Sequence, residues 1–131
     1  MYPGRPGYDS KAPWIQVDAP DKARKVREAL SVAIDRQAIL DKILKGQGQV
    51  AIAPFAFITG DFAFNKSDWK APKYDVAAAK RLLTEGGYPN GFSIEMPIYT
   101  LAGRTGLDGI GQAVAGMWEA IGVKVKQTPI E

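Results

Sequence analysis

Between residues 92 and 128 the spacing of apolar side chains changes twice, and this pattern restricts the chain to few folds. From Phe92 to Tyr99 apolar and polar residues alternate, which predicts a strand. From Leu107 to Ile121 apolar residues recur every three or four positions, which predicts a helix with one buried face. Gly122 can close that helix in the left-handed conformation, after which alternation resumes. Strands joined by such a helix are nearly always parallel neighbours, so we expect an α/β layer against which the rest of the chain packs.

Composition excludes several classes of site. The chain has 131 residues, of which 46% are hydrophobic and 24% charged, and this predicts one globular domain. It has no cysteine and no histidine, which excludes disulfides, thiolate or histidine-dependent catalysis, and zinc sites built from these residues. A net charge of +3, spread along the chain, does not indicate nucleic acid or an anionic membrane as a partner. We expect neither a metal nor another cofactor.

The first 17 residues are rich in proline and glycine, and they predict an extended surface segment anchored by Trp14 and Ile15. This part of the sequence has no apolar run that could serve as a signal peptide or span a bilayer. The sequence therefore predicts a soluble chain without membrane insertion, which stays in the cytoplasm if Met1 is the natural start.

Three amphipathic helices are expected in residues 18–91, before the first predicted strand. Their expected ranges are 22–33, 36–45 and 76–85. Aspartate is a common cap because its carboxylate accepts hydrogen bonds from free N–H groups at the start of a helix. We expect Asp18 or Asp21 to cap the first helix, Asp35 the second and Asp75 the third.

A long aromatic loop is predicted between the second and third helices. Residues 50–73 show no periodicity, and long irregular loops in compact domains are often binding loops. Two alternatives stay open for its rings. They either cover the core as a lid or contact a ligand directly, in which case the contacts come from Phe55, Phe57 and Trp69.

Four segments of the sequence resemble family 5 bacterial extracellular solute-binding proteins, the peptide, dipeptide and nickel receptors of ABC importers. They are KVREALSVAIDRQAI at 25–39 with KGQGQ at 45–49, YDVAAAKRLL at 74–83, GYPNGF at 87–92 and AIGVKV at 120–125. Each segment is common by itself, but the four occur in the family's order. The resemblance implies part of one lobe of a periplasmic-binding-protein-like fold. Such a part would hold an extended segment at 1–17, three helices and the aromatic loop at 18–91, and a βαβ unit at 92–129.

The resemblance also implies capture of a solute without catalysis. Receptors of this kind close two lobes around an oligopeptide or another small solute and present it to a membrane permease. A second lobe, which this chain lacks, and an ABC permease are therefore the implied partners. The implied location is the periplasm or another extracytoplasmic space.

The expected position of a ligand is the carboxyl end of the strands, where open α/β sheets leave a crevice. In this sequence that edge includes the end of the first predicted strand and the loop before the last helix. Free N–H groups at a helix start and an arginine side chain both attract carboxylates. We expect the cleft to be lined by Tyr99, Thr100, Arg104 and Thr105. The alternative is an exposed capped loop without a ligand.

Two other classes of function stay open. A lobe without its other parts has unpaired strand edges, and this predicts a self-associating module, a homodimer formed by sheet-edge or helix-face pairing. A small carboxylate-dependent hydrolase is the third class, but no Asp or Glu lies in a setting that indicates a shifted pKa. We therefore expect no enzyme.

Overall fold

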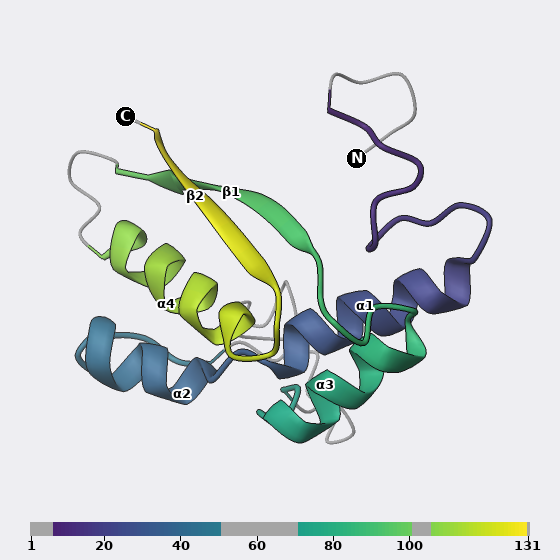
Figure 1. Cartoon of the computed structure of the whole chain (residues 1–131). Coiled ribbons are helices and arrows are strands. Elements are labelled where there is room, and N and C mark those ends of the chain that lie inside the picture. The colour runs from purple at the N-terminus through teal and green to yellow at the C-terminus, as the bar shows by residue number, and fades with distance from the viewer. Residues whose placement is uncertain (1–6, 51–70, 101–105, 131) are drawn as a thin grey trace, which may run out of the picture.

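A computed structural model describes residues 7–50, 71–100 and 106–130 of the chain. Within these ranges the elements follow the predicted order, and the α/β class is confirmed (Figure 1). The helices are α1 (Pro20–Val32), α2 (Arg36–Ala38), the π-helix η1 (Ile39–Ile43), α3 (Val76–Glu85) and α4 (Leu107–Glu119). The strands are β1 (Ser93–Tyr99) and β2 (Lys124–Ile130). In the part that the structure describes, every helix is too short or too polar to cross a membrane.

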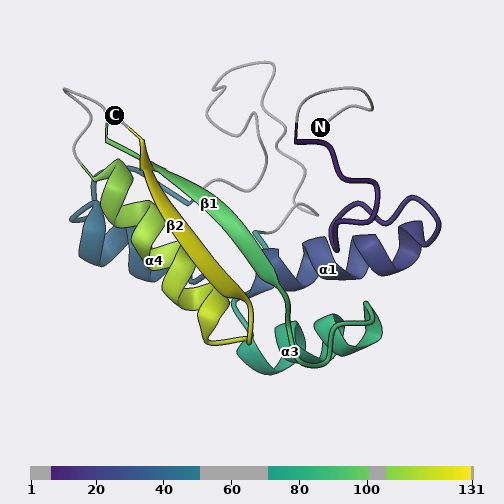
Figure 2. The same cartoon turned by 45° about the horizontal axis from the view of Figure 1, so that its top comes forward.

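The predicted strand, helix and strand are confirmed as a parallel βαβ unit. β1 pairs directly with β2, with Ile94 opposite Val125 in the register. α4 connects the strands and lies along one face of the sheet (Figure 1 and Figure 2). The approach is close because Gly111 has no side chain: a Cβ atom there would lie 2.8 Å from Cδ1 of Ile98. Ile98 therefore points toward α4.

The largest buried cluster lies between α1 and α3, which the views place side by side (Figure 2). Val26 of α1 and Leu83 of α3 are its largest helical side chains, and neither is more than 1% exposed. Ile121 and Val123 extend the cluster to the start of β2. The βαβ unit was expected to be the centre of the packing; it contributes Ile121 and Val123 to this cluster, whose other buried members come from α1, the residue after it, and α3. A two-stranded sheet offers little area for burial, and in α4 only Ala115 is fully buried.

Two of the three predicted helix caps are confirmed. Oδ1 of Asp35 accepts a hydrogen bond from the N–H of Ala38 at 2.9 Å, and Oδ1 of Asp75 accepts one from Ala78 at 2.8 Å. The cap predicted for the first helix is wrong. Its N-cap residue is Ala19, which makes no side-chain capping bond, because the helix already begins at the following proline. Proline suits that first position, since its fixed φ is helical and it has no N–H to satisfy.

The second helix and the N-terminal segment also differ from expectation. The second helix widens into η1, where the N–H of Leu44 donates to the carbonyl of Ile39 at 3.1 Å, and it ends before Lys45. The described residues before α1 form hydrogen-bonded turns and are not fully extended. The prediction that Trp14 anchors them is confirmed, because its ring lies 6.0 Å from that of Phe92, centroid to centroid.

Candidate functional site

The carboxyl ends of both strands lie at one end of the molecule, beside the first turn of α4 (Figure 1). Tyr99 is the last residue of β1, and it is 49% exposed. Thr100 follows it and is also exposed, while its backbone N–H donates to the carbonyl of Ile130 at 3.1 Å. Two of the predicted cleft residues therefore lie at the expected edge with accessible side chains. The other two, Arg104 and Thr105, lie outside the described residues.

The end of η1 packs against the start of α4 and helps to form this edge. A Cβ atom on Gly106 would lie 3.7 Å from Cδ2 of Leu44, and one on Gly109 would lie 3.3 Å from Cγ2 of Ile43. These glycines let the two helices meet closely. The sequence did not predict this contact, because it joins residues about sixty positions apart that share no motif.

A surface hollow of about 280 Å³ lies at the junction of these helices. Its polar lining includes Lys45 and Gln47, which follow η1, and Gly106, which precedes α4. Gly106 is the N-cap of α4 in a left-handed conformation (φ 93°) and supplies no side-chain cap, so N–H groups of the first turn lack a side-chain acceptor from it. Asp108 in that turn contributes one negative charge. Lys45 and Gln47 belong to the KGQGQ segment, which carried part of the family resemblance but was not predicted to line a site.

The aromatic residues predicted to contact a ligand, Phe55, Phe57 and Trp69, lie outside the described residues. Where the described chain resumes, Tyr74 is 44% exposed and borders a second hollow of about 350 Å³. Arg36 also lines this hollow, but its guanidinium already forms hydrogen bonds within the protein. It donates to the carbonyl of Ser31 at 2.9 Å and to the hydroxyl of Ser31 at 3.0 Å. Arg36 therefore closes the end of α1 and has little capacity left for a ligand.

Two ion pairs occur among the described residues, Lys25 with Glu85 and Lys126 with Glu95. A hydrogen bond and the charge of Lys25 lower the pKa of Glu85 below its usual value, and Lys126 lowers the pKa of Glu95 in the same way. A general acid at neutral pH needs a raised pKa. No group of three potential metal ligands occurs in the described part either.

Comparisons with known proteins show which family of proteins this chain is similar to. The family model for bacterial extracellular solute-binding proteins, family 5 Middle, matches residues 10–131. Heme-binding protein A of Haemophilus influenzae is 32% identical over 115 residues, which are 86% of this chain and 20% of that protein. Oligopeptide-binding protein AppA of Bacillus subtilis is 28% identical, over 90% of this chain and 23% of that protein.

A solved structure shows the same architecture. The periplasmic binding protein DppA of Helicobacter pylori, in complex with the peptide STSA, matches 84% of this chain with a TM-score of 0.64 and 25% identity. The match covers 20% of the DppA chain. This chain thus spans about a fifth of the length of the relatives that it matches.

Proposed function

This chain belongs to the family 5 bacterial extracellular solute-binding proteins, and we propose that it forms part of the lobe that closes over a peptide-type solute. The observation that carries the proposal is that exposed polar side chains occur both at the carboxyl end of β1 and in the hollow beside the start of α4. Tyr99 ends β1 and Thr100 follows it, and Lys45 and Gln47 follow η1. In this role the chain binds and does not catalyse.

The chemistry of these groups suits the end of a peptide. Lys45 can attract a terminal carboxylate, and the free N–H groups of the first turn of α4 favour negative charge in the same place. Tyr99 offers an aromatic ring and a hydroxyl, and Thr100 and Gln47 can hydrogen-bond to peptide amides. Arg104 and Thr105, from the loop that precedes α4, would add a second cation and a hydroxyl. The aromatic residues Phe55, Phe57 and Trp69 are proposed as supporting contacts.

The proposal implies further parts. A second lobe would enclose the solute by hinge closure. An ABC permease in the membrane would then receive the solute from the extracytoplasmic side. The names of the matched relatives include heme and oligopeptides, so family membership leaves the solute open. We favour a peptide because the proposed edge combines a cation with several neutral hydrogen-bonding groups.

Titration with di- to pentapeptides tests this function. A ligand at about 100 times its Kd should stabilise the folded chain by about 2.7 kcal/mol, which a thermal-shift assay detects. We expect Lys45→Gln to weaken binding of peptides with a free terminal carboxylate and to leave amidated peptides unaffected. Lys42→Gln is the matched control, because Lys42 is exposed on η1 and does not line the hollow. Absence of a shift with every peptide contradicts the proposal.

A second candidate is self-association of the chain as a homodimer. Its support is the sheet itself, which has only two strands in the described part, so each strand has an edge with no described strand beside it. Tyr99 and Ile130, at the ends of the strands, are among the large exposed apolar side chains. Sedimentation equilibrium tests this candidate, and a monomer at high protein concentration contradicts it.

A further inference from the structure

The hydrogen bonds between the strands determine which backbone groups of β2 face outward. The N–H of Lys124 donates to the carbonyl of Phe92 at 2.8 Å, and the carbonyl of Ile130 accepts from Thr100 at 3.1 Å. Lys124 and Ile130 therefore direct their backbone groups toward β1, and so do the residues two and four positions after Lys124. The intervening residues present theirs to the outer edge, and these are Val125, Gln127 and Pro129.

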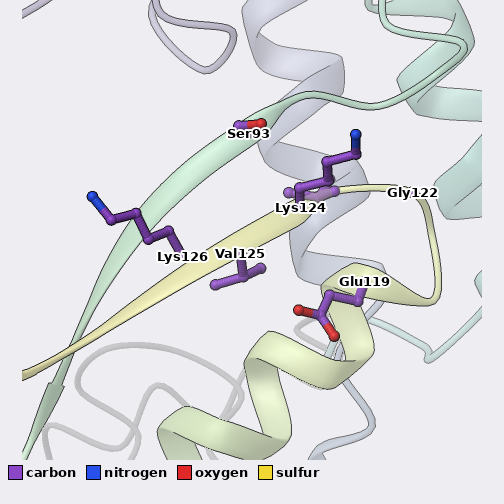
Figure 3. Close-up of a pocket in the computed structure, with 7 residues that line it drawn as sticks. Ser93, Glu119, Gly122, Lys124, Val125 and Lys126 are labelled. Carbon is purple, nitrogen blue, oxygen red and sulfur yellow. The ribbon is translucent and has the colours of Figure 1, made fainter.

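The outer edge of β2 opens onto a surface hollow of about 570 Å³ (Figure 3). Lys124 and Lys126 point away from α4, whereas Val125 points toward it and Glu119 approaches from the last turn of that helix. Among the described residues no strand pairs with this edge. The edge therefore has room for an additional strand.

Proline makes the hydrogen-bonding capacity of this edge unequal. Val125 and Gln127 each offer an outward N–H and carbonyl, but Pro129 offers a carbonyl only. An antiparallel second copy centred on Gln127 matches this set. The N–H of Gln127 would donate to Gln127 of the second copy, and the N–H of Val125 would donate to the carbonyl of Pro129 of the second copy. Every outward N–H of both strands would then have an acceptor.

The lysines of β2 exclude the competing registers. With Gln127 at the centre, Lys126 lies opposite Thr128 and Lys124 opposite Ile130 of the second copy, so no like charges face each other. A pairing centred on Val125 would place Lys124 opposite Lys126, and one centred on Lys126 would place that residue opposite its own copy. Like charges directly opposite destabilise a sheet. Edge lysines usually discourage pairing, but here they are compatible with the register centred on Gln127.

Pairings centred nearer the end of β2 form fewer hydrogen bonds between described residues. With Thr128 at the centre, the N–H of Val125 would face residue 131, which lies outside the described residues. With Pro129 at the centre, the two prolines face each other and neither donates. The register centred on Gln127 therefore combines satisfied donors with separated charges.

We propose that the outer edge of β2 pairs antiparallel with the same edge of a second copy of this chain, centred on Gln127. This would join the two sheets into one of four strands, with both copies of α4 on the same face, because the twofold axis would be perpendicular to the sheet. The inference rests on the homodimer candidate and is independent of ligand capture.

Gln127→Pro tests the hydrogen bonds of this interface. The N–H of Gln127 points away from β1, so the change leaves the β1–β2 ladder intact while it removes two interface donors from the dimer. We expect the dimer dissociation constant from sedimentation to rise by about tenfold or more. Gln127→Ala keeps the N–H and is the matched control. Circular dichroism shows that each variant is folded, and unchanged dimerisation of folded Gln127→Pro overturns the register.

Single cysteines test the register directly, because the chain has no cysteine of its own. In Gln127→Cys the two Cα atoms would lie about 5.5 Å apart, within the range of a disulfide, so oxidation should give a covalent dimer. In the matched control Lys124→Cys they would lie about 20 Å apart, and no covalent dimer should form.

The outcomes separate the two levels of the proposal. Selective cross-linking of Gln127→Cys supports the register. Equal or reversed cross-linking in a dimeric chain overturns the register and leaves the homodimer candidate standing. A monomeric parent chain overturns both the register and the homodimer. A monomer whose β2 edge binds an extended peptide also overturns both, because a different partner would then occupy the edge.

Discussion

At the scale of single residues, two glycines determine how the chain enters the two strands. Gly91 precedes β1 and Gly122 precedes β2, and both have left-handed backbones, with φ of 73° and 96°. A Cβ atom on Gly91 would lie 1.9 Å from the carbonyl oxygen of Gly122. The chain at Gly91 can therefore cross the turn at Gly122 only without a side chain, whereas a Cβ atom on Gly122 would lie 4.0 Å from the nearest atoms of Gly91.

Gly91→Ala is expected to destabilise the chain strongly. The left-handed backbone costs alanine about 1 kcal/mol, and relief of the overlap with the carbonyl of Gly122 adds to that loss. Gly87→Ala is the matched control, because Gly87 has φ 93° but a Cβ atom added there would meet no other atom within 4 Å. Urea unfolding measures both losses of free energy. Equal losses in the two variants would show that the crossing does not restrain the strands.

Residues whose role depends only on their neighbours in the sequence, such as helix caps and glycines that end helices, were predictable. Asp35 and Asp75 act as the predicted helix caps, and Gly122 takes the predicted left-handed conformation. The cap of the first helix was not predicted, because Pro20 itself starts the helix and needs no acceptor. Lys45 and Gln47, which line the hollow beside α4, were not among the predicted candidates either. Their position depends on packing between η1 and α4, which leaves no pattern in either segment.

At the scale of elements, an ion pair joins the middle of α1 to the end of α3. Lys25 and Glu85 are sixty residues apart, and their charged groups are hydrogen-bonded above the buried contact between the helices. Both side chains are partly exposed, at 34% and 44%, so water and salt screen the attraction. The ion pair therefore contributes little to the free energy of unfolding at any one pH, and its main effect is to make the stability of the α1–α3 contact depend on pH.

We expect this ion pair to weaken as the solution is acidified. Because the pKa of Glu85 is lowered in the folded chain, its stabilising contribution is present above the ordinary value of 4.5 and is lost as the pH falls through the folded pKa. Thermal unfolding from pH 7 to pH 3 should therefore show Glu85→Gln less stable than the parent near neutrality, with the difference vanishing in acid. Glu28→Gln, an exposed position on α1, is the control. A constant difference across this range would assign the loss to another cause.

The periodicity of the sequence predicted the elements but not all of their geometry. The change from period two to period 3.6 and back identified β1, α4 and β2 with shifts of only one or two residues at their ends. The π-helix η1 was not predicted, because one wider turn changes the apolar spacing too little to be read from a short segment. The bonded residue pair Ile39 and Leu44 reveals it only in the structure.

At the scale of the whole molecule, the sequence predicted the fold class and the edge of the sheet at which Tyr99 and Thr100 lie, but not that α1 and α3 supply most of the buried cluster. Tyr99 and Thr100 lie at the predicted carboxyl end of the sheet because parallel topology alone determines that position. The α1–α3 cluster became the main core because small residues such as Ala29 and Ala79 let those helices approach closely. The spacing of apolar residues placed these alanines on the apolar faces of their helices, but it could not show that the two faces pack against each other.

Two side-chain hydrogen bonds join α4 of the βαβ unit to the end of α1 and to the residue that caps α2. The indole Nε1 of Trp118 donates to the carbonyl of Leu30 at 3.0 Å, and Sδ of Met117 accepts from the backbone N–H of Asp35 at 3.3 Å. Trp118 also packs against the buried cluster between α1 and α3. These contacts link the βαβ unit to the helical core across long sequence separations.

We therefore expect Trp118→Ala to reduce the cooperativity of unfolding as well as its free energy. Removing a large aromatic side chain that packs on the core costs about 3 kcal/mol, and the helical core could then unfold separately from the βαβ unit. Urea unfolding followed by circular dichroism and by fluorescence of the remaining tryptophans should give transitions that no longer coincide. Trp118→Phe keeps the ring contact and loses only the hydrogen bond, so it should cost about 1 kcal/mol and stay cooperative. Coincident transitions with an unchanged urea dependence in Trp118→Ala would show that the βαβ unit and the helical core are coupled elsewhere.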